Sequence, residues 1–238
     1  MFSGIGFFHL AHGHDDPLSA LNTELAQNPQ LNDALLVLPE AFNLGRPYAE
    51  HGVPAIHREA ILSALSGIHS AYKISFVVGL IEPDGKPFSS AYFVADGEPL
   101  LICHKATRDG ADYDACSDPD KSNPVILPDA AIVTAICNDL SCAARCENLA
   151  KAALEAKKSL TVFCIPAAMY KEGGWFGGAM LDCPLYFPAK PYECHVVLAN
   201  SYADGQGSFI TDSAGIVRRR LLGDHRQKNQ ISIFPVQT

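Results

Sequence analysis

The sequence of 238 residues lacks a long apolar run. No stretch approaches the ~20 apolar residues that are needed to span a bilayer, so we expect no membrane partner. A surplus of basic residues is missing as well: 18 Lys and Arg stand against 26 Asp and Glu, and the formal net charge is −8. Because phosphate binding needs a basic surface, this balance argues against a nucleic-acid partner. The one dense basic run, Arg218-Arg219-Arg220, is expected to be a solvated strand end or hairpin.

Patterns that bind nucleotides and metals are also absent. No Gly-x-Gly-x-x-Gly or phosphate-loop motif occurs, so a nucleotide cofactor is not indicated. The histidines and cysteines that lie close together in the sequence are His9, His12, His14, Cys137, Cys142 and Cys146. No Cys or carboxylate completes a recognised site around the histidines, and the cysteines lack the Cys-x-x-Cys spacing of zinc and iron–sulfur sites. We expect neither a cofactor nor a metal.

An export signal is not recognisable at the N-terminus. Residues 1–8 have no basic start and no small-residue cleavage site, and they are typical of a first buried strand. We therefore expect a cytoplasmic protein whose eight cysteines are reduced. Cys103 and Cys164 lie within apolar runs, where a thiol serves as a small hydrophobic side chain.

The chain shows no repeat, no low-complexity tract and no long linker, and its length suits a single domain over residues 1–238. Helices are expected over residues 17–27, 54–72 and 145–158, the first with Asp15 or Asp16 as its N-cap. Strands are expected over residues 5–10, 35–38, 74–81, 90–95, 99–104, 130–136, 160–165, 194–199, 208–212, 216–222 and 230–234. This alternation predicts an α/β fold with a mixed sheet.

Turn residues separate several of these strands. Asp84-Gly85 and Asp96-Gly97 are typical of hairpin turns, and Pro166 is expected to end the strand over residues 160–165. Short connections of this kind favour antiparallel neighbours beside the helix-linked strands.

Three strands end in side chains that together suit nucleophilic catalysis. Glu40 follows the strand over residues 35–38, Lys105 follows the strand that ends at His104, and Cys137 follows the apolar run 130–136. They supply a proton carrier, a cation and a nucleophile at junctions of strand and loop. Taken singly, each has a simpler interpretation: a strand-end carboxylate, a solvated turn lysine and a buried structural thiol. Their shared placement favours catalysis.

The same segments resemble the signature stretches of a known family. Leu38-Pro39-Glu40-Ala41-Phe42, Cys103-His104-Lys105 and Ile136-Cys137-Asn138-Asp139 are similar, in order and spacing, to the three motifs of the nitrilase superfamily, the carbon–nitrogen hydrolases. Residues 196–200 and 207–215 resemble the late strand and the Asp-containing hairpin of that family. The resemblance implies a four-layer α-β-β-α sandwich of two mixed sheets with outer helices, which associates as a homodimer or a higher homo-oligomer.

An amide is a poor electrophile with a poor leaving group, and its hydrolysis needs all three roles. The resemblance implies that Cys137 forms a thioester acyl-enzyme and that Glu40 takes the thiol proton and delivers it to the departing nitrogen. The resemblance also implies that Lys105, with a backbone N–H near Asn138, stabilises the tetrahedral oxyanion. Water is then expected to hydrolyse the thioester with Glu40 as base.

The neighbourhood of the motifs differs from the family in ways that concern the substrate. Many members carry a second glutamate about eight residues after the lysine, where this chain has Asp112-Tyr113-Asp114. The Asn138-Asp139 pair is closer to the amidase and carbamoylase branches than to true nitrilases. Many relatives continue with an arginine and an aromatic-Pro-Glu motif, which residues 140–144 lack. The candidate substrate-binding residues are Asn138, Asp112, Tyr113, Asp114 and Trp175, the last in a glycine-flanked loop.

The expected substrate is a small amide or an N-carbamoyl compound. Three alternatives stay open: a glutaminase-type ammonia donor, a nitrile hydrolase, and a catalytically impaired relative that serves as a binding or assembly module. The altered region around Tyr113 and the proline-rich segment over residues 184–193 motivate the last of these.

Overall fold

The computed structural model describes residues 2–11, 16–43, 57–82, 88–105, 123–141, 143–168, 194–201, 208–221 and 228–236. The helices are α1 (Pro17–Gln27), α3 (Arg58–Tyr72), α4 (Ala143–Glu155) and the short 3-10 helix η2 (Cys137–Ser141). The strands are β1 (Gly4–His9), β2 (Ala34–Val37), β3 (Ser75–Glu82), β4 (Phe88–Val94), β5 (Leu100–His104), β6 (Val125–Ile126), β7 (Ala130–Thr134), β8 (Leu160–Ala167), β9 (His195–Asn200), β10 (Phe209–Thr211), β11 (Val217–Arg220) and β12 (Gln230–Pro235).

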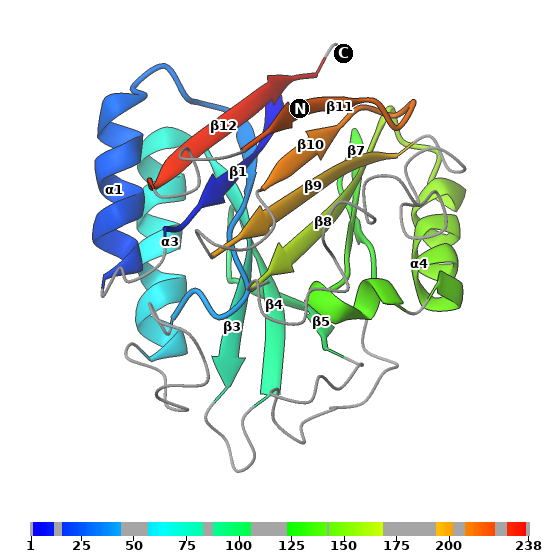
Figure 1. The fold of residues 1–238 in the computed structure, drawn as a ribbon, viewed down its shortest axis with the longest axis horizontal. Helices are drawn as coiled ribbons and strands as arrows, with labels where there is room; N and C mark the ends of the chain where they lie inside the picture. The colour runs from blue at the N-terminus through cyan, green and yellow to red at the C-terminus, as the bar shows by residue number, and fades with distance from the viewer. Residues whose placement is uncertain are drawn as a thin grey trace.

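The strands form two six-stranded mixed sheets. One has the order β12-β1-β2-β3-β4-β5 and the other β11-β10-β9-β8-β7-β6. Within each sheet three central strands run parallel, β1 to β3 and β7 to β9, and the remaining pairings are antiparallel. Figure 1 shows α1 and α3 on one outer side, α4 on the other, and the two sheets between them. The four-layer α-β-β-α sandwich expected from the sequence is therefore confirmed.

Two hydrophobic cores hold these layers together. The larger core lies between the sheets and beneath α4, and the smaller one lies between the first sheet and the helices α1 and α3. Alternation along a strand divides the side chains between them, because successive residues point to opposite faces. Phe7 of β1 belongs to the larger core, and its neighbour Phe8 belongs to the smaller one.

The helix ends follow from local chemistry. Asp16 is the N-cap of α1 and its carboxylate accepts a hydrogen bond from the Ser19 N–H at 2.9 Å, which settles the choice between Asp15 and Asp16. Helix α3 ends at Tyr72 as expected, because Lys73 adopts a left-handed φ of 58°. Helix α4 ends at Glu155, three residues before the expected end, because Lys157 adopts a φ of 50° that a right-handed helix cannot continue through.

Strand bounds differ from expectation most clearly at Pro166. The proline was expected to end its strand, yet β8 continues to Ala167. The Cys164 carbonyl accepts a hydrogen bond from the Ala135 N–H, so the backbone polar groups of Cys164 point toward β7. Residues two apart on a strand point to the same side, so the Pro166 nitrogen, which carries no hydrogen, also points toward β7. Because the ladder between β7 and β8 ends at Thr134 and Cys164, the proline leaves no ladder hydrogen bond unmade.

Other expectations have mixed outcomes. The strand expected over residues 130–136 stops at Thr134, and the short strand β6 had no sequence signal that we recognised. Gly97 has the positive φ of 91° that the Asp96-Gly97 turn requires. The Asp84-Gly85 turn and residues 54–56 of the expected second helix lie outside the described residues.

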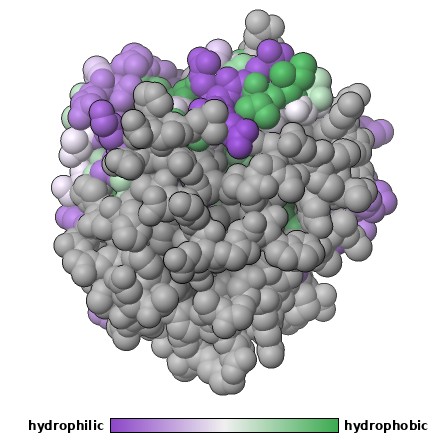
Figure 2. Space-filling model, in the orientation of Figure 1, coloured by the Kyte–Doolittle hydropathy of each residue, from purple (hydrophilic) through white to green (hydrophobic). Residues whose placement is uncertain are grey.

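Among the described residues visible in Figure 2, hydrophilic side chains predominate, and hydrophobic ones gather mainly near the upper edge of the view. The run Arg218-Arg219-Arg220 is exposed on the edge strand β11, which confirms the expectation of a solvated strand. Charged side chains on an edge strand oppose pairing with another chain. Among the described residues, no helix is both long enough and apolar enough to cross a membrane.

Candidate active site

The carboxyl ends of the parallel strands meet at one end of the sandwich. Strand β5 runs in the same direction as β3, since both pair antiparallel with β4. The ends of β2, β5 and β7 are therefore followed by Glu40, Lys105 and Cys137, in the order that the sequence predicts. The two sheets contribute unequally: the first supplies Glu40 and Lys105, and the second supplies Cys137.

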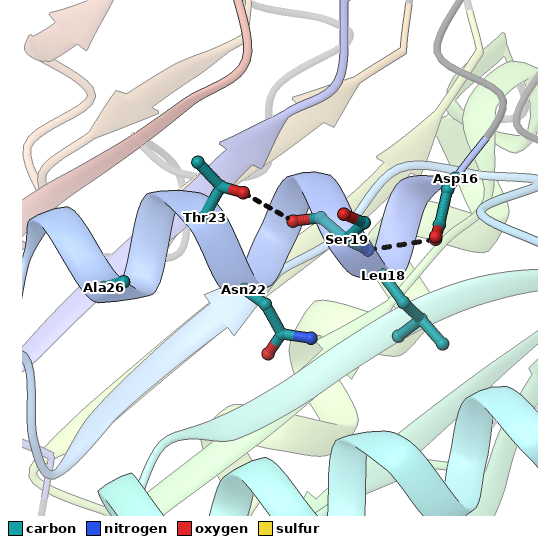
Figure 3. A pocket seen from close by; sticks show the side chains of 6 residues that line it. All are labelled: Asp16, Leu18, Ser19, Asn22, Thr23 and Ala26. Carbon is teal, nitrogen blue, oxygen red and sulfur yellow. Dashed lines mark hydrogen bonds between the residues drawn. The ribbon is translucent and has the colours of Figure 1, made fainter.

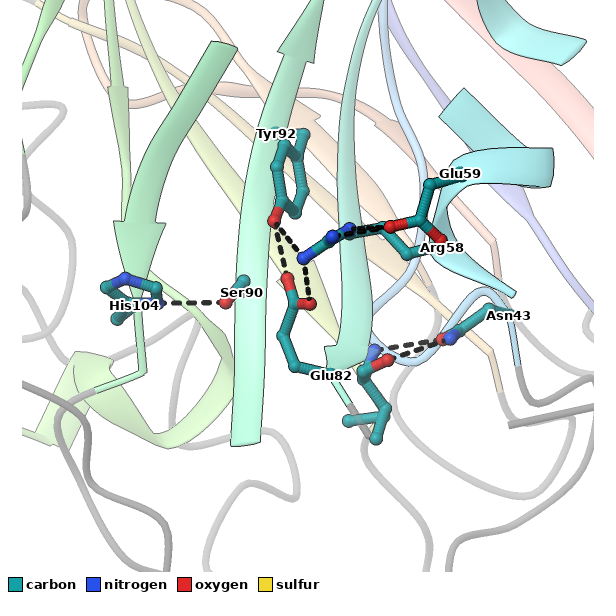
Figure 4. Close-up of polar contacts among 8 residues, drawn as sticks. Asn43, Arg58, Glu59, Glu82, Ser90, Tyr92 and His104 are labelled. Carbon is teal, nitrogen blue, oxygen red and sulfur yellow. Dashed lines mark hydrogen bonds and ion pairs between the residues drawn. The ribbon is translucent and has the colours of Figure 1, made fainter. Parts of the chain in front are cut away.

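The loop that carries Glu40 is fixed through its backbone. After β2 the chain continues alongside β3, where the N–H groups of Leu38 and Phe42 donate to the carbonyls of Val77 and Gly79 at 2.8 and 2.9 Å. The Asn43 side chain then exchanges two hydrogen bonds of 2.9 Å with the backbone of Ile81 (Figure 4). Between these contacts the loop leaves the sheet, and the Glu40 N–H donates to the Ala167 carbonyl at 3.3 Å. Glu40 thus connects the two sheets.

A glycine makes this crossing possible. A Cβ atom on Gly79 would lie 2.7 Å from the Glu40 Cα and 3.0 Å from the Pro166 Cβ, and a backbone atom cannot move aside as a flexible side chain can. The residue after Glu40, Ala41, adopts a left-handed φ of 56°, a conformation that non-glycine residues enter at a cost. The position of Glu40 therefore depends on close backbone packing as well as on hydrogen bonds.

Lys105 and Glu40 form a buried ion pair. The Lys105 Nζ lies 3.2 Å from the Glu40 Oε1, and the side chains are only 4% and 2% exposed. The Lys105 backbone N–H donates to the Ser89 carbonyl at 2.9 Å, which extends the pairing of β4 with β5 by one residue. Removal of two charges from water is costly unless they are paired, and here each compensates the other.

Cys137 stands at a sharp turn between strand and helix. It is the first residue of η2, it has a φ of 48°, and it is 6% exposed. The Asp139 N–H donates to the Ile136 carbonyl at 2.9 Å, and the Ile136 N–H donates to the Asp139 carboxylate at 3.2 Å, so the turn is closed from both sides. The sequence predicted a thiol at a strand end; the left-handed backbone at Cys137 was not foreseen.

The turn of Cys137 and the loop of Glu40 both contact β8. Helix η2, which begins at Cys137, packs against β8. The Ala167 carbonyl at the end of the same strand accepts the Glu40 N–H at 3.3 Å. Strand β8 therefore links the loop that carries the carboxylate to the turn that carries the thiol.

The remaining candidate residues have different outcomes. Asp112, Tyr113, Asp114 and Trp175 lie outside the described residues. The backbone of Asn138 belongs to η2. Sequence reasoning missed the Asn43 anchor and Arg145, a cation in the first turn of α4 that approaches Asp139 to 3.9 Å.

The other cysteines of the described chain are buried, and Cys103 and Cys164 belong to a hydrophobic core, as the sequence predicts for these two. Burial raises the pKa of the Cys164 thiol well above its usual range, so this residue stays protonated and inert. No group of three or more His, Cys, Asp or Glu side chains with metal-binding geometry occurs in the described part of the chain.

Two surface hollows lie away from this region. One follows the outer face of α1, where Figure 3 shows Asp16 capping the helix and the Thr23 hydroxyl donating to the Ser19 carbonyl at 2.9 Å. The other lies at the opposite ends of β8 and β9, beside Thr161 and His195. Neither is lined by the three candidate catalytic residues.

Comparison with known proteins shows which solved structures share this fold. No family model matches the sequence, and no curated protein matches it. Solved structures do match. A mutant of the Nesterenkonia AN1 amidase from the nitrilase superfamily has a TM-score of 0.75 at 19% identity, over 98% of this chain and 90% of that one.

Two further structures of the amidase from Nesterenkonia sp. AN1 carry ligands. A double mutant in complex with acrylamide has a TM-score of 0.76 at 18% identity, over 99% of this chain and 91% of that one. A mutant with the acetamide moiety of fluoroacetamide added covalently at the active-site cysteine has a TM-score of 0.73 at 19% identity, over 98% and 89% of the two chains. The chain thus has, along nearly its whole length, the fold of an amidase from the nitrilase superfamily.

Proposed function

We propose that the chain is a thiol hydrolase of the nitrilase superfamily that cleaves a non-peptide C–N bond in a small amide or N-carbamoyl compound. The observation that carries the proposal is the buried ion pair of Glu40 and Lys105, 3.2 Å apart, at the strand ends where the turn of Cys137 also lies. The fold of the Nesterenkonia amidase, whose active-site cysteine forms a covalent adduct, supports the assignment.

In the proposed reaction, Glu40 accepts the proton of the Cys137 thiol while the sulfur attacks the amide carbon. The carbonyl oxygen becomes an oxyanion, which the Lys105 ammonium and a backbone N–H near Asn138 stabilise. When the C–N bond breaks, Glu40 donates its proton to the departing nitrogen, and ammonia or an amine leaves a thioester on Cys137. Water then attacks the thioester while Glu40 takes a water proton. The C–S bond breaks, the acid product leaves, and Glu40 returns the proton to the Cys137 sulfur.

The substrate side of the proposal rests on Asn138 and on the neighbouring fold. The Asn138-Asp139 pair is similar to that of the amidase and carbamoylase branches, and the solved amidase binds acrylamide. We assign the pocket to Asn138, Asp112, Tyr113, Asp114 and Trp175. We also propose that residues 1–238 form a single catalytic domain that assembles as a homodimer or a higher homo-oligomer in the cytoplasm, which light scattering and cell fractionation would test.

Labelling with iodoacetamide tests the proposed nucleophile. We expect preferential, pH-dependent modification of Cys137 over the seven other cysteines, mapped by mass spectrometry, with Cys164 as the buried internal control. Glu40→Gln or Lys105→Ala should remove the preference. A panel of small amides, N-carbamoyl compounds and nitriles with ammonia detection then defines the substrate class. Indiscriminate labelling together with no ammonia from any compound would refute the proposal.

A further inference from the structure

Arg145 reaches from α4 to both halves of the proposed active site. Its Nη2 donates to the carbonyl of His104 at 3.2 Å and lies 3.9 Å from the Asp139 Oδ2. The same nitrogen approaches the Cys103 Sγ at 3.8 Å. The guanidinium is only 13% exposed, so these contacts form largely out of water.

Each contact fixes the neighbour of a proposed catalytic residue. His104 is the last residue of β5, directly before Lys105, and β5 is the outer strand of the first sheet. Asp139 lies two residues after Cys137, and its carboxylate also accepts the Ile136 N–H that closes the Cys137 turn. Arg145 itself belongs to α4, which packs on the second sheet. One side chain therefore connects the strand that presents Lys105 to the turn that presents Cys137.

The chemistry of arginine suits this position. A guanidinium offers five N–H donors in a rigid plane and keeps its charge at any pH the protein tolerates, whereas a lysine ammonium is a flexible point charge. Asp139 is fully buried, and a buried carboxylate requires a nearby cation or hydrogen-bond donors. Arg145 supplies the cation and still donates to the His104 carbonyl.

We propose that Arg145 is a positioning residue that sets the separation of Lys105 and Cys137 by holding the His104 carbonyl and the Asp139 carboxylate together. This role rests on the proposed function, because it matters for catalysis only if both residues react with one substrate. In this role Arg145 acts through the backbone next to each of the two residues.

Removal of Arg145 has two separable consequences. The tether between β5 and η2 is lost, which misplaces Lys105 relative to Cys137. The buried Asp139 carboxylate also loses its cation close to the thiol, and an uncompensated negative charge disfavours the thiolate. In the described part of the chain, two ion pairs lie beside the ends of β5 and β7, one between Glu40 and Lys105 and one between Asp139 and Arg145. Neutralising Asp139 as well should reverse the second consequence and leave the first.

The experiment compares Arg145→Met, Arg145→Lys and the double variant Asp139→Asn/Arg145→Met with the exposed control Arg219→Lys. We expect Arg145→Met to lower kcat for amide hydrolysis by about 100-fold with a smaller change in KM, as misplacement of reacting groups by about 1 Å does. Arg145→Lys should recover part of kcat. The pH midpoint of Cys137 alkylation by iodoacetamide should rise in Arg145→Met and return in the double variant, whose kcat stays low.

The outcomes separate the possible failures. If Arg145→Met lowers only the melting temperature, with kcat and the alkylation midpoint unchanged, the residue is structural and the inference is overturned. If Arg145→Met does not fold, the pair Arg145→Lys and Asp139→Asn decides, since full kcat in both would overturn it. If the unaltered protein hydrolyses no amide, the proposed function fails, while the alkylation midpoints still show whether Arg145 governs the thiol.

Discussion

Two buried glutamates of the first sheet show how differently the same side chain can be held. Glu40 and Glu82 are 2% and 1% exposed, and each faces a cation. Glu82 ends β3 and is held through its carboxylate: Arg58 of α3 and the Tyr92 hydroxyl of β4 both donate to it at 2.5 Å (Figure 4). Glu40 pairs with Lys105, and its loop is also held through the backbone, by the Ala167 carbonyl and by the carbonyls of β3.

The cations differ as well. Arginine does not lose its proton in proteins, and burial together with the hydrogen bond to Glu82 raises the pKa of the Tyr92 hydroxyl far above its usual range. Through its hydrogen bonds with Arg58 and Tyr92, Glu82 joins α3 to the sheet. Glu40 faces a lysine, whose protonation is adjustable, and its carboxyl group is anchored by the chain behind it. A backbone anchor fixes the position of the Glu40 carboxyl group and leaves the group able to gain and lose a proton. A proton carrier needs both properties.

Glu40→Gln gives the largest expected effect. The amide cannot carry the proton between sulfur and nitrogen, so kcat/KM should fall by about 10²- to 10⁴-fold. Steady-state ammonia release measures this, and Glu82→Gln is the matched control because it also removes a buried carboxylate. Equal losses of kcat/KM in the two folded variants would contradict the claim that Glu40 carries the proton and Glu82 does not.

Glu82→Gln should act on stability instead. Arg58 is 31% exposed, so water partly solvates its guanidinium when it faces a neutral amide, and the loss of this charged hydrogen bond should cost about 1 to 3 kcal/mol. Urea denaturation followed by fluorescence measures the change in the free energy of unfolding. The folded variant should keep kcat/KM close to the original value. A loss of activity without a loss of stability would show that Glu82, with Arg58 and Tyr92, belongs to the catalytic site.

Gly79→Ala tests the backbone anchor of Glu40 directly. The added methyl group meets the Glu40 Cα at 2.7 Å, so we expect a lower kcat and a loss of about 1 to 3 kcal/mol of stability. Gly67→Ala in α3 is the control: no atom lies within 4 Å of the new Cβ, and this exposed helical position should gain about 0.5 to 1 kcal/mol. Full activity in Gly79→Ala would show that the loop that carries Glu40 can shift without a loss of catalysis.

Asp212→Asn, the smallest expected effect, extends the comparison to a carboxylate near the surface. Burial opposes ionisation of Asp212, but hydrogen bonds from the Ile216 and Ala214 backbone and from Arg218 outweigh it and lower the Asp212 pKa. A lowered pKa stabilises the fold above about pH 4, the ordinary Asp value, and this contribution is lost as pH falls through the folded-state pKa. The melting temperatures of Asp212→Asn and the original should therefore differ at pH 6 and converge toward pH 2.

Local chemistry allowed much of the fold to be predicted. The Asp16 cap, the apolar periodicity and the strand-end positions of Glu40, Lys105 and Cys137 are all properties of short segments. The resemblance supplied the layer order, which periodicity alone does not determine. Pro166 was misjudged because its tolerance depends on where the neighbouring strand ends, a fact of register rather than of residue type.

The anchors of the site were harder to find for the same reason. Asn43 bonds to a residue 38 positions along the chain, and Arg145 bonds to one 41 positions away. No local sequence pattern indicates partners at such separations. Arg145 had one usable signal: it is the first cation after Cys137, in a segment that lacks the arginine many relatives carry nearer the cysteine. The left-handed backbone at Cys137 had none, because the residue type is not one that favours it.

The pairing of β1 with β12 has a consequence for how the sheet forms. Gly4 lies opposite Pro235 and His9 opposite Gln230, so these two adjacent strands are separated by most of the described sequence. Contacts of such long sequence separation form slowly, and the β1 edge stays open until β12 pairs with it. Completion of the sheet that carries Glu40 and Lys105 should therefore be a late step of folding.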